Sequence, residues 1–446
     1  GIAVTGMTSG NGTWEYSTNS GSSWTDVGTV ADNNALLLTA SDLLRFIPDG
    51  ENGTSANVTY RAWDQTSGTE GTKVDTTTNG MATAFSTATD TASITVNSVN
   101  DAPTLTGGTV DLGTTDEDTT TGGTTVSSLL TGTGYADVDA GADSGIAVTV
   151  TTGNGTWEYS TDGSTWTGFG TVSTAAALLL DSGSQVRYVP DGQNGETATF
   201  NFVAWDQTSG TASTNGSPQT GNASSAGGTN AFSFGNGSTV LTVDDVNDAP
   251  VLTPAAPTFP TIDEDATGNA GQQVSTLLGT SVSDVDSGVD EGIAITGLNS
   301  GNGTWEYSLD GGASWTDVGT VTNSSALLLT ASDFLRFRPN GETGTTADIT
   351  YRAWDQSDGD EGNKVDTAPN GSTTEFSTAT DTASITVTAV NDAPTVTAPT
   401  GPLNATEETS FAFTGANAIS IADVDAGGSD LTLDISVTDG ALSFGT

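Results

Sequence analysis

Hydrophobic and polar residues alternate along short segments of this chain, with the two-residue period of a β-strand. In the segment GTWEYS, the side chains of Trp14 and Tyr16 point to one face and that of Glu15 to the other. The segments 58–64 and 92–99 alternate in the same way, and Asn-Gly or Asp-Gly pairs separate many such segments, as turns do. No segment has a convincing helical period, so the pattern predicts an all-β protein.

The same segments recur in the same order along the sequence. The octamer GNGTWEYS occupies residues 10–17, 153–160 and 301–308. The pentamer VNDAP ends at Pro103, Pro250 and Pro394. Both markers give a repeating unit of about 145 residues. We therefore divide the chain into most of one repeat, two whole repeats and the start of a fourth, with the bounds 1–99, 100–246, 247–390 and 391–446.

Each repeat is predicted to be an antiparallel β-sandwich of about nine or ten short strands, in an extended tandem rod. Trp14 and Trp24 flank a turn and are expected on the buried face of a hairpin. A sugar-binding platform is the alternative role for these aromatic side chains, but a place in the core is the more common one. The recurring Arg45, Arg187 and Arg336 are expected to pair with acids or to cap main-chain carbonyls within the sandwich, with ligand binding as the alternative.

The charge of the chain excludes several partners. The sequence has 8 Lys and Arg residues against 55 Asp and Glu residues, a net charge of −47. Such a surface repels nucleic acid and anionic lipid, so we expect neither as a partner. No apolar stretch reaches the length of about 18 residues that a membrane-spanning helix needs, so no membrane insertion is expected in this segment.

Cysteine and histidine are both absent. Their absence removes disulfide bonds, thiolate or imidazole metal sites, and Ser-His or Cys-His catalysis. Any bound metal must therefore take oxygen ligands, which favours Ca²⁺ over Zn²⁺. Paired carboxylates serve glycosidases, but here the acids recur in every repeat, as structural ligands do. We therefore expect no enzymatic activity.

Certain acidic residues keep their distance from the VNDAP proline. A glutamate follows 14 residues after it, at Glu117, Glu264 and Glu408. An Asp-Val-Asp triplet begins 34, 34 and 29 residues after the proline, with carboxylates at Asp137 and Asp139, Asp284 and Asp286, and Asp423 and Asp425. The segment AWDQ supplies Asp64, Asp206 and Asp355. Turn-forming aspartates on a solvated surface are the alternative, but their spacing has no reason to be constant.

Strand length places these acids at the two ends of a repeat. A strand of about nine residues spans about 30 Å, so Glu117 is expected at the far end of its repeat, beside Asn247 and Asp248. The Asp-Val-Asp triplet is expected back at the near end, beside the linker that opens the repeat, with the aspartate of AWDQ closing the same site. Such a cluster is unfavourable by itself, and Ca²⁺, with six to eight oxygen ligands, would stabilise it.

These motifs, VNDAP, ADVDAG and AWDQTSG, resemble the bacterial cadherin-like tandem repeats of giant secreted adhesins (RTX, type I-secreted) over essentially the whole chain. In cadherins such residues share Ca²⁺ between successive domains. The resemblance implies a first junction of Asn100, Asp101, Asp137, Asp139 and Asp206. It implies a second of Glu117, Asp245, Asn247, Asp248, Asp284, Asp286 and Asp355, and a third of Glu264, Asn391, Asp392, Asp423 and Asp425. The mid-domain Leu-Asp-Arg-Glu motif has no clear counterpart, which favours one or two ions per junction over three.

The expected function is therefore structural or adhesive. We expect a secreted, extracellular segment that forms a calcium-stiffened stalk or fibre of a bacterial surface protein and continues at both ends. Neighbouring repeats, other copies of the chain in a fibre, and surface glycans or cells are the expected partners. A carbohydrate- or receptor-binding module of a secreted adhesin is the alternative.

Overall fold

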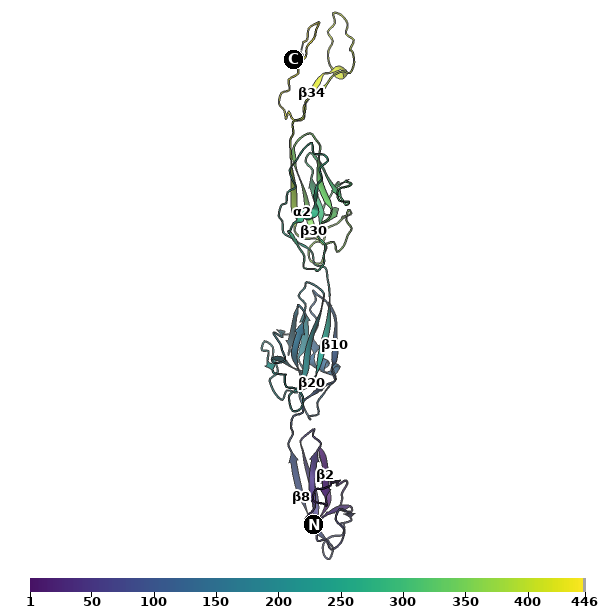
Figure 1. The fold of residues 1–446 in the computed structure, drawn as a ribbon, viewed down its shortest axis with the longest axis vertical. Helices are drawn as coiled ribbons and strands as arrows, with labels where there is room; N and C mark the ends of the chain where they lie inside the picture. The colour runs from purple at the N-terminus through teal and green to yellow at the C-terminus, as the bar shows by residue number, and fades with distance from the viewer. Residues whose placement is uncertain (444–446) are drawn as a thin grey trace. The chain divides into compact units, whose positions relative to one another are not determined.

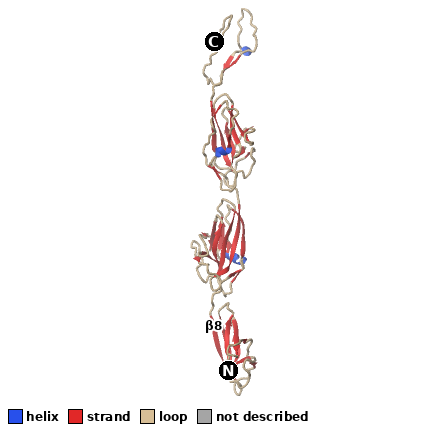
Figure 2. Cartoon of the chain, viewed as in Figure 1, coloured by secondary structure: helices blue, strands red, loops and turns tan. Residues whose placement is uncertain are grey.

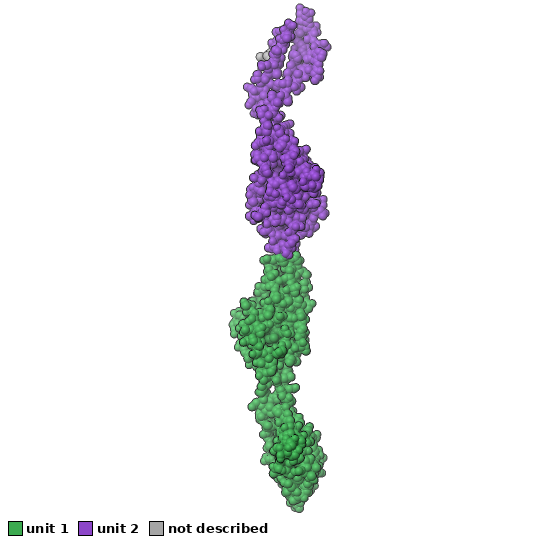
Figure 3. Space-filling model, in the orientation of Figure 1, with its two compact units in different colours: residues 1–245 green, residues 246–446 purple. Residues whose placement is uncertain are grey.

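The computed structural model describes residues 1–443, and its regular structure is almost entirely β (Figure 2). The chain forms two compact units, residues 1–245 and residues 246–446 (Figure 3). The first unit holds the first two repeats, and the second unit holds the remainder. The fold is that of tandem β-sandwiches, as the alternating pattern predicts.

The first repeat contains a five-stranded sheet in the order β7-β4-β1-β6-β8 and a three-stranded sheet in the order β3-β2-β5. It lies at the purple end of the chain (Figure 1). Its strands are β1 (Ile2–Thr8), β2 (Gly12–Ser17), β3 (Thr25–Asp26), β4 (Ala35–Leu38), β5 (Leu43–Pro48), β6 (Thr54–Trp63), β7 (Lys73–Val74) and β8 (Phe85–Val96).

The second repeat has a six-stranded sheet, β10-β20-β18-β13-β16-β19, a four-stranded sheet, β11-β17-β14-β15, and the small pair β12-β9. Its elements are β9 (Thr104–Leu105), β10 (Gly108–Asp116), β11 (Thr124–Thr125), α1 (Val126–Gly132), β12 (Tyr135–Ala136), β13 (Gly145–Thr152), β14 (Thr156–Ser160), β15 (Thr167–Gly168), β16 (Ala177–Asp181), β17 (Gln185–Val189), β18 (Glu196–Trp205), β19 (Thr220–Gly221) and β20 (Phe232–Asp244).

The third repeat has the same arrangement, with sheets β22-β32-β30-β25-β28-β31 and β23-β29-β26-β27 and the pair β21-β24. Its elements are β21 (Val251–Leu252), β22 (Ile262–Asp263), β23 (Gln272–Gln273), α2 (Val274–Leu278), β24 (Val282–Ser283), β25 (Gly292–Asn299), β26 (Gly303–Ser308), β27 (Thr316–Asp317), β28 (Ala326–Thr330), β29 (Phe334–Pro339), β30 (Thr345–Trp354), β31 (Lys364–Val365) and β32 (Asp381–Thr388). The fourth repeat adds β33 (Thr395–Thr397), the 3₁₀ turn η1 (Gly415–Asn417) and β34 (Ser420–Ala422).

Two short helices correct the expectation that the chain has no helix. In α1, the hydroxyl of Thr125 accepts a hydrogen bond from the amide of Ser128 and caps the first turn. Leu129 and Leu130 of this helix are buried in the core, as are Leu277 and Leu278 of α2. A helix of five to seven residues is too short to show a period in the sequence, so the pattern could not reveal either one.

A parallel strand closes one edge of the large sheet in the second and third repeats. There β10 pairs with β20, and β22 with β32, which corrects the expectation of purely antiparallel pairing. Within the described residues of the first repeat, no strand beyond β6 pairs with β8. The identical segments STATDTASITV therefore differ in burial: Ile94 is 40% exposed, whereas Ile385 is 4% exposed.

The recurring tryptophan of GTWEYS is a core residue, as predicted. Trp14, Trp157 and Trp305 are at most 6% exposed and belong to the hydrophobic cores of their repeats. This burial removes them as a sugar-binding platform. The expectation for Trp24 is wrong, because this side chain is only half-buried and lies outside the core, under the guanidinium group of Arg45 at 3.9 Å.

Arginine–glutamate pairs link neighbouring strands of the smaller sheet in each repeat, as predicted. The pairs are Arg45–Glu15, Arg187–Glu158 and Arg336–Glu306, each with a nitrogen–oxygen distance of 2.7 Å. Each guanidinium group also lies over a tryptophan ring, of Trp24, Trp166 or Trp315. A planar cation that bonds a carboxylate and stacks on a ring explains why arginine recurs here.

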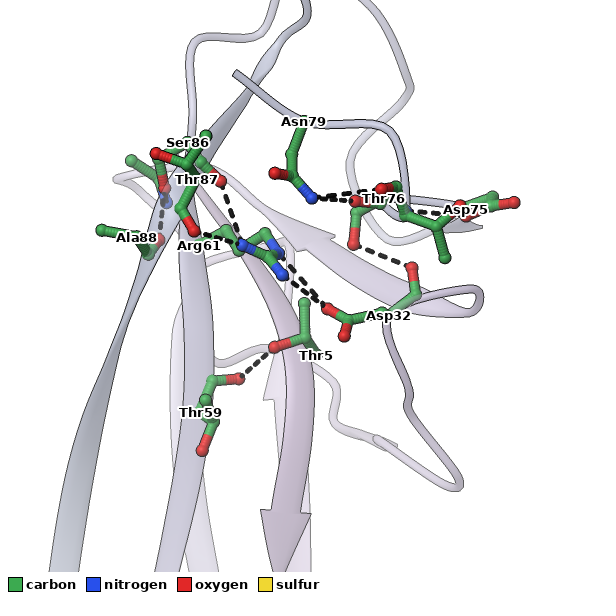
Figure 4. Close-up of polar contacts among 12 residues, drawn as sticks. Thr5, Asp32, Thr59, Arg61, Asp75, Thr76, Asn79, Ser86, Thr87 and Ala88 are labelled. Carbon is green, nitrogen blue, oxygen red and sulfur yellow. Dashed lines mark hydrogen bonds and ion pairs between the residues drawn. The ribbon is translucent and has the colours of Figure 1, made fainter.

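A second arginine of the first repeat, Arg61, holds the turn before β4, and the long loop after β6 is bonded to that turn (Figure 4). Arg61 bonds the carboxylate of Asp32 at 3.1 Å and the main-chain oxygens of Ser86 and Thr87. The hydroxyl of Thr76 donates to the main-chain oxygen of Asp32 at 2.8 Å. The loop is thus tied to the sheet by side chains as well as by β7.

Candidate metal sites

A small pair of strands positions the linker beside the Asp-Val-Asp triplet in each of the last three repeats. Each VNDAP segment leads into a short strand that pairs antiparallel with the strand just before the triplet. These pairs are β9 with β12, β21 with β24, and β33 with β34. Because antiparallel partners run in opposite directions, the triplet returns to the start of the repeat, as strand length predicted.

The first cluster lies within the first unit, at the start of the second repeat. The side-chain amide of Asn100 donates to Asp206 Oδ2 at 2.9 Å. The main-chain amide of Asp101 donates to Asp139 Oδ2 at 2.8 Å, and that of Asp139 donates to Asp137 Oδ1 at 2.9 Å. Hydrogen bonds thus join Asn100 to Asp206, and Asp139 to both Asp101 and Asp137. Asp206 is 2% exposed, and its other oxygen accepts hydrogen bonds from the amide and hydroxyl of Thr208.

The second cluster repeats this geometry at the start of the third repeat. Asn247 Nδ2 donates to Asp355 Oδ2 at 3.0 Å, and the amide of Asp248 donates to Asp286 Oδ2 at 2.7 Å. The amide of Asp286 donates to Asp284 Oδ1 at 3.0 Å. These five residues lie in the second unit. Glu117 and Asp245, also assigned to this junction, lie in the first unit, where their carboxylate oxygens are within 4.8 Å of each other.

The parallel strands explain why the early glutamate lies at the far end of its repeat. β10 runs beside β20 in the same direction, so Glu117, which follows β10, reaches the end of β20. Its amide donates to the main-chain oxygen of Asp244 at 3.1 Å. Glu264 follows β22 in the same way, and its amide donates to the main-chain oxygen of Thr388 at 3.0 Å.

The third cluster joins the end of the third repeat to the start of the fourth, within the second unit. Carboxylate oxygens of Glu264, Asp392 and Asp425 all lie within 4.8 Å of one another. The amide of Asp392 donates to Asp425 Oδ2 at 2.5 Å, and that of Asp425 donates to Asp423 Oδ1 at 2.9 Å. Asn391 is the exception among the predicted residues, because its exposed side chain bonds the main-chain oxygen of Asp392.

Glu264 is the most buried acid of this cluster, with 0% of its surface exposed. Its Oε1 accepts a hydrogen bond from the amide of Val390 at 2.7 Å. Its Oε2 accepts no hydrogen bond from any described residue. Burying such an oxygen without a partner is costly, so this carboxylate has the environment of a ligand. Its counterpart Glu408, in the fourth repeat, is exposed.

Loss of hydration and neighbouring negative charge raise carboxyl pKa values in all three clusters. Burial raises the pKa of Asp137, and the charges of Asp139 and Asp206 raise it further. Burial likewise raises the pKa of Asp284, with the charges of Asp286 and Asp355 adding to the effect. Lost hydration, followed by the charge of Asp425, raises the pKa of Asp392. Each raised pKa means that folding makes the ionised form of that carboxyl group less favourable in free energy.

These residues fit a hard divalent cation. Two oxygens bound to one Ca²⁺ at about 2.4 Å each lie at most about 5 Å apart, and the third cluster meets that limit. The available ligands are carboxylate, amide and main-chain oxygens, because the chain has no Cys or His. Charge, oxygen spacing and the bare oxygen of Glu264 all agree with such an ion.

Two contacts at these clusters are invisible in the sequence motifs. Tyr135 donates its hydroxyl proton to Asp137 Oδ2 at 3.4 Å, and this burial beside acids raises the pKa of the phenol. Asn52, from the first repeat, bonds the main chain on both sides of Asp139. Tyr135 stands two residues before the triplet, where the other repeats have Val282 and Ile421. Because the tyrosine does not recur, comparison of the repeats could not identify it.

No protein-family model and no curated protein matches the sequence. Among solved structures, the adhesive subunit CfaE of the CFA/I fimbria of enterotoxigenic Escherichia coli aligns with 11% identity over 63% of this chain and 99% of its own, at a TM-score of 0.24. SporoSAG from Toxoplasma gondii aligns with 12% identity over 64% of this chain and 98% of its own, at a TM-score of 0.14. Likeness at this level carries no argument about function. Among the described residues, no helix is long and apolar enough to cross a membrane.

Proposed function

We propose that the three acidic clusters bind Ca²⁺ and that this chain is a calcium-stiffened, non-enzymatic stalk or fibre segment. It would belong to a bacterial surface protein of the cadherin-like class and act outside the cell. Its direct partners would be the neighbouring repeats of the same protein and other copies in a fibre. Surface glycans or cells would be the targets of the whole assembly.

The observation that carries this proposal is the environment of Glu264. A fully buried carboxylate with one oxygen unsatisfied, beside Asp392 and Asp425, is strongly unfavourable unless a cation binds it. The same glutamate bonds the linker amide at Val390. This glutamate of the third repeat would thereby supply a ligand next to those of the fourth.

The side chains of each cluster would have distinct tasks. In the third cluster, Glu264 from the end of the third repeat and the Asp-Val-Asp carboxylates of the fourth repeat would supply ligands from both sides of the linker. The linker asparagines Asn100 and Asn247 orient the late aspartates Asp206 and Asp355 through their amide groups. The bound cation would supply positive charge that neutralises the cluster and fixes the angle between repeats.

The net charge of −47 supports an ion-dependent stiffness. Without cations, the acids at each linker repel one another and favour a loose chain. Ligand binding to the folded form adds stability that grows with free ion concentration, reaching about 4 kcal/mol at a thousand times the dissociation constant. A chain that is loose at low calcium and stiff at the millimolar calcium outside cells suits an exported stalk.

Calcium removal tests the proposal. Thermal unfolding and small-angle X-ray scattering of the whole chain would be measured in chelator and in about 2 mM CaCl₂, which is close to the extracellular concentration. The same concentration of MgCl₂ is the control. We expect Ca²⁺ to raise the melting temperature by about 5 °C or more and to narrow the distribution of molecular lengths. Identical melting curves and scattering profiles with and without Ca²⁺ would overturn the proposal.

A further inference from the structure

An asparagine of the first repeat contacts the acidic loop of the second repeat. Asn52 Nδ2 donates to the main-chain oxygen of Val138 at 2.8 Å, and its Oδ1 accepts from the amide of Ala140 at 2.7 Å. One planar amide thus satisfies a carbonyl and an amide that are two residues apart. The side-chain amide of Asn52 therefore makes the two hydrogen bonds that the main chain of a neighbouring β-strand makes in a sheet.

The turn that carries Asn52 is fixed to its own repeat, so the side chain is presented in a defined direction. The turn joins β5 to β6, and the amide of Asp49 donates to the main-chain oxygen of Asn11 at 3.1 Å. The amide of Gly53 donates to Ser98 Oγ at 3.0 Å, beside the linker. A Cβ on Gly53 would lie 2.6 Å from the amide nitrogen of Ser98, so only glycine allows this approach.

The residue between the two bonded positions is Asp139 of the first cluster. Its carboxylate accepts from the linker amide of Asp101, and its own amide donates to Asp137. Asn52 therefore bonds the main chain on both sides of a predicted ligand. Since Val138 and Ala140 are themselves exposed, no core contact fixes this loop in its place.

We propose that Asn52 is the recognition contact through which the first repeat docks onto the second, and that it positions Asp139 for the cation. The partner surface is the main chain of residues 138–140. The docking contact stands on the hydrogen bonds alone, whereas the positioning of a cation ligand rests on the proposed function.

The third repeat provides a natural comparison. Its turn has Thr343 at the position of Asn52. A threonine hydroxyl is a single group and cannot span a carbonyl and an amide two residues apart. Thr343 Oγ1 instead accepts a hydrogen bond from Asn302 of its own repeat at 2.7 Å. The second repeat has an asparagine, Asn194, at this position. The hydrogen bonds of Asn52 therefore distinguish the junction after the first repeat from the junction after the third.

The test is Asn52→Ala in the whole chain, with Thr343→Ala as the matched control. Hydrogen exchange measured by mass spectrometry would be followed in peptides that cover residues 136–142, with β6 peptides as the internal control for folding. In chelator, we expect Asn52→Ala to speed exchange at 136–142 by about tenfold, while β6 stays protected. Thr343→Ala should leave residues 136–142 unchanged.

Calcium titration gives the second readout. We expect Asn52→Ala to weaken the first cluster by about tenfold, in the range seen when supports of metal ligands are removed. Unchanged exchange at 136–142 would overturn the docking contact, and unchanged affinity together with faster exchange would overturn the positioning role. If the wild-type chain binds no Ca²⁺ while Asn52→Ala still speeds exchange, the proposed function fails and the docking contact stands.

Discussion

Glu264 Oε1 accepts a hydrogen bond from the amide of Val390 at 2.7 Å, across 126 positions of sequence. The bond ties the beginning of the third repeat to the linker that ends it. Oε2 of the same carboxylate accepts no hydrogen bond from the described residues, and a carboxylate oxygen of Glu264 lies within 4.8 Å of carboxylate oxygens of Asp392 and Asp425 in the fourth repeat. A single buried side chain thus both bonds the linker at the end of its repeat and belongs to the candidate metal site.

Replacing this glutamate with glutamine separates its charge from its shape. We expect Glu264→Gln to weaken Ca²⁺ binding at the third cluster by about tenfold or more, because one charged ligand is lost. Without Ca²⁺ the variant should be as stable as wild type or more so, since a buried charge is removed. Calorimetric titration and chelator melts would measure both effects, with the exposed Glu361→Gln as the control. Equal affinities for the two variants would contradict the assignment.

Calcium binding should weaken on acidification. The raised pKa values of Asp137, Asp284 and Asp392 mean that the folded chain takes up these protons more readily than the unfolded chain. In chelator, the contribution of these carboxyls therefore favours folding at low pH. It is lost as the pH rises through their raised values, above the ordinary aspartate value of about 3.9.

Because a cation needs the ionised form, Ca²⁺ must displace these protons when the pH is close to the raised values. Titration calorimetry in two buffers of different ionisation heat would count the protons released. We expect release near pH 5 that declines toward pH 8. No release at either pH, with constant affinity, would rule out these aspartates as the binding groups.

The two copies of STATDTASITV allow one substitution to be compared in two environments. Ile385 is 4% exposed in the core of the third repeat, so Ile385→Ala should cost about 2–4 kcal/mol of unfolding free energy. Ile94 is 40% exposed, and Ile94→Ala should cost less than about 1 kcal/mol. Urea unfolding, monitored by hydrogen exchange in peptides of each repeat, gives both values. Equal costs would mean that β8 is covered in solution.

The arginine–glutamate pairs differ in burial and should differ in their contribution to stability. The side chains of Arg336 and Glu306 are 14% and 9% exposed, against 42% and 23% for Arg45 and Glu15. We expect Arg336→Lys to cost about 1–2 kcal/mol, since lysine cannot both stack on Trp315 and bond the carboxylate through a planar group. Arg45→Lys should cost less than about 0.5 kcal/mol. The same unfolding experiment would compare them, and a larger loss for Arg45→Lys would contradict this ranking.

The sequence by itself determined the features that depend on local pattern and on repetition. Alternation in GTWEYS predicted a strand with Trp14 on its buried face, and both the strand β2 and the buried Trp14 are found, whereas Glu15 is half-buried. An arginine recurs at the same place in successive repeats of a chain that has few basic residues, which predicted that these arginines pair with acids. The ion pair of Arg187 with Glu158 is an example. The recurrence of the Asp-Val-Asp triplet and of AWDQ in each repeat, together with strand length, grouped Asp137, Asp139 and Asp206 before any fold was known, because each repeat folds by the same rules.

Only the tertiary structure decided features that depend on distant segments. Ile94 and Ile385 have identical neighbours in sequence, and their burial differs because a parallel strand lies beside β32 and none of the described residues covers β8. Trp24 lies outside the core, where its ring packs under the guanidinium group of Arg45. Asn52 reads in sequence as an ordinary turn residue. Its contact with residues 138 and 140 exists because two repeats meet there, and no local pattern encodes the meeting of two folded surfaces.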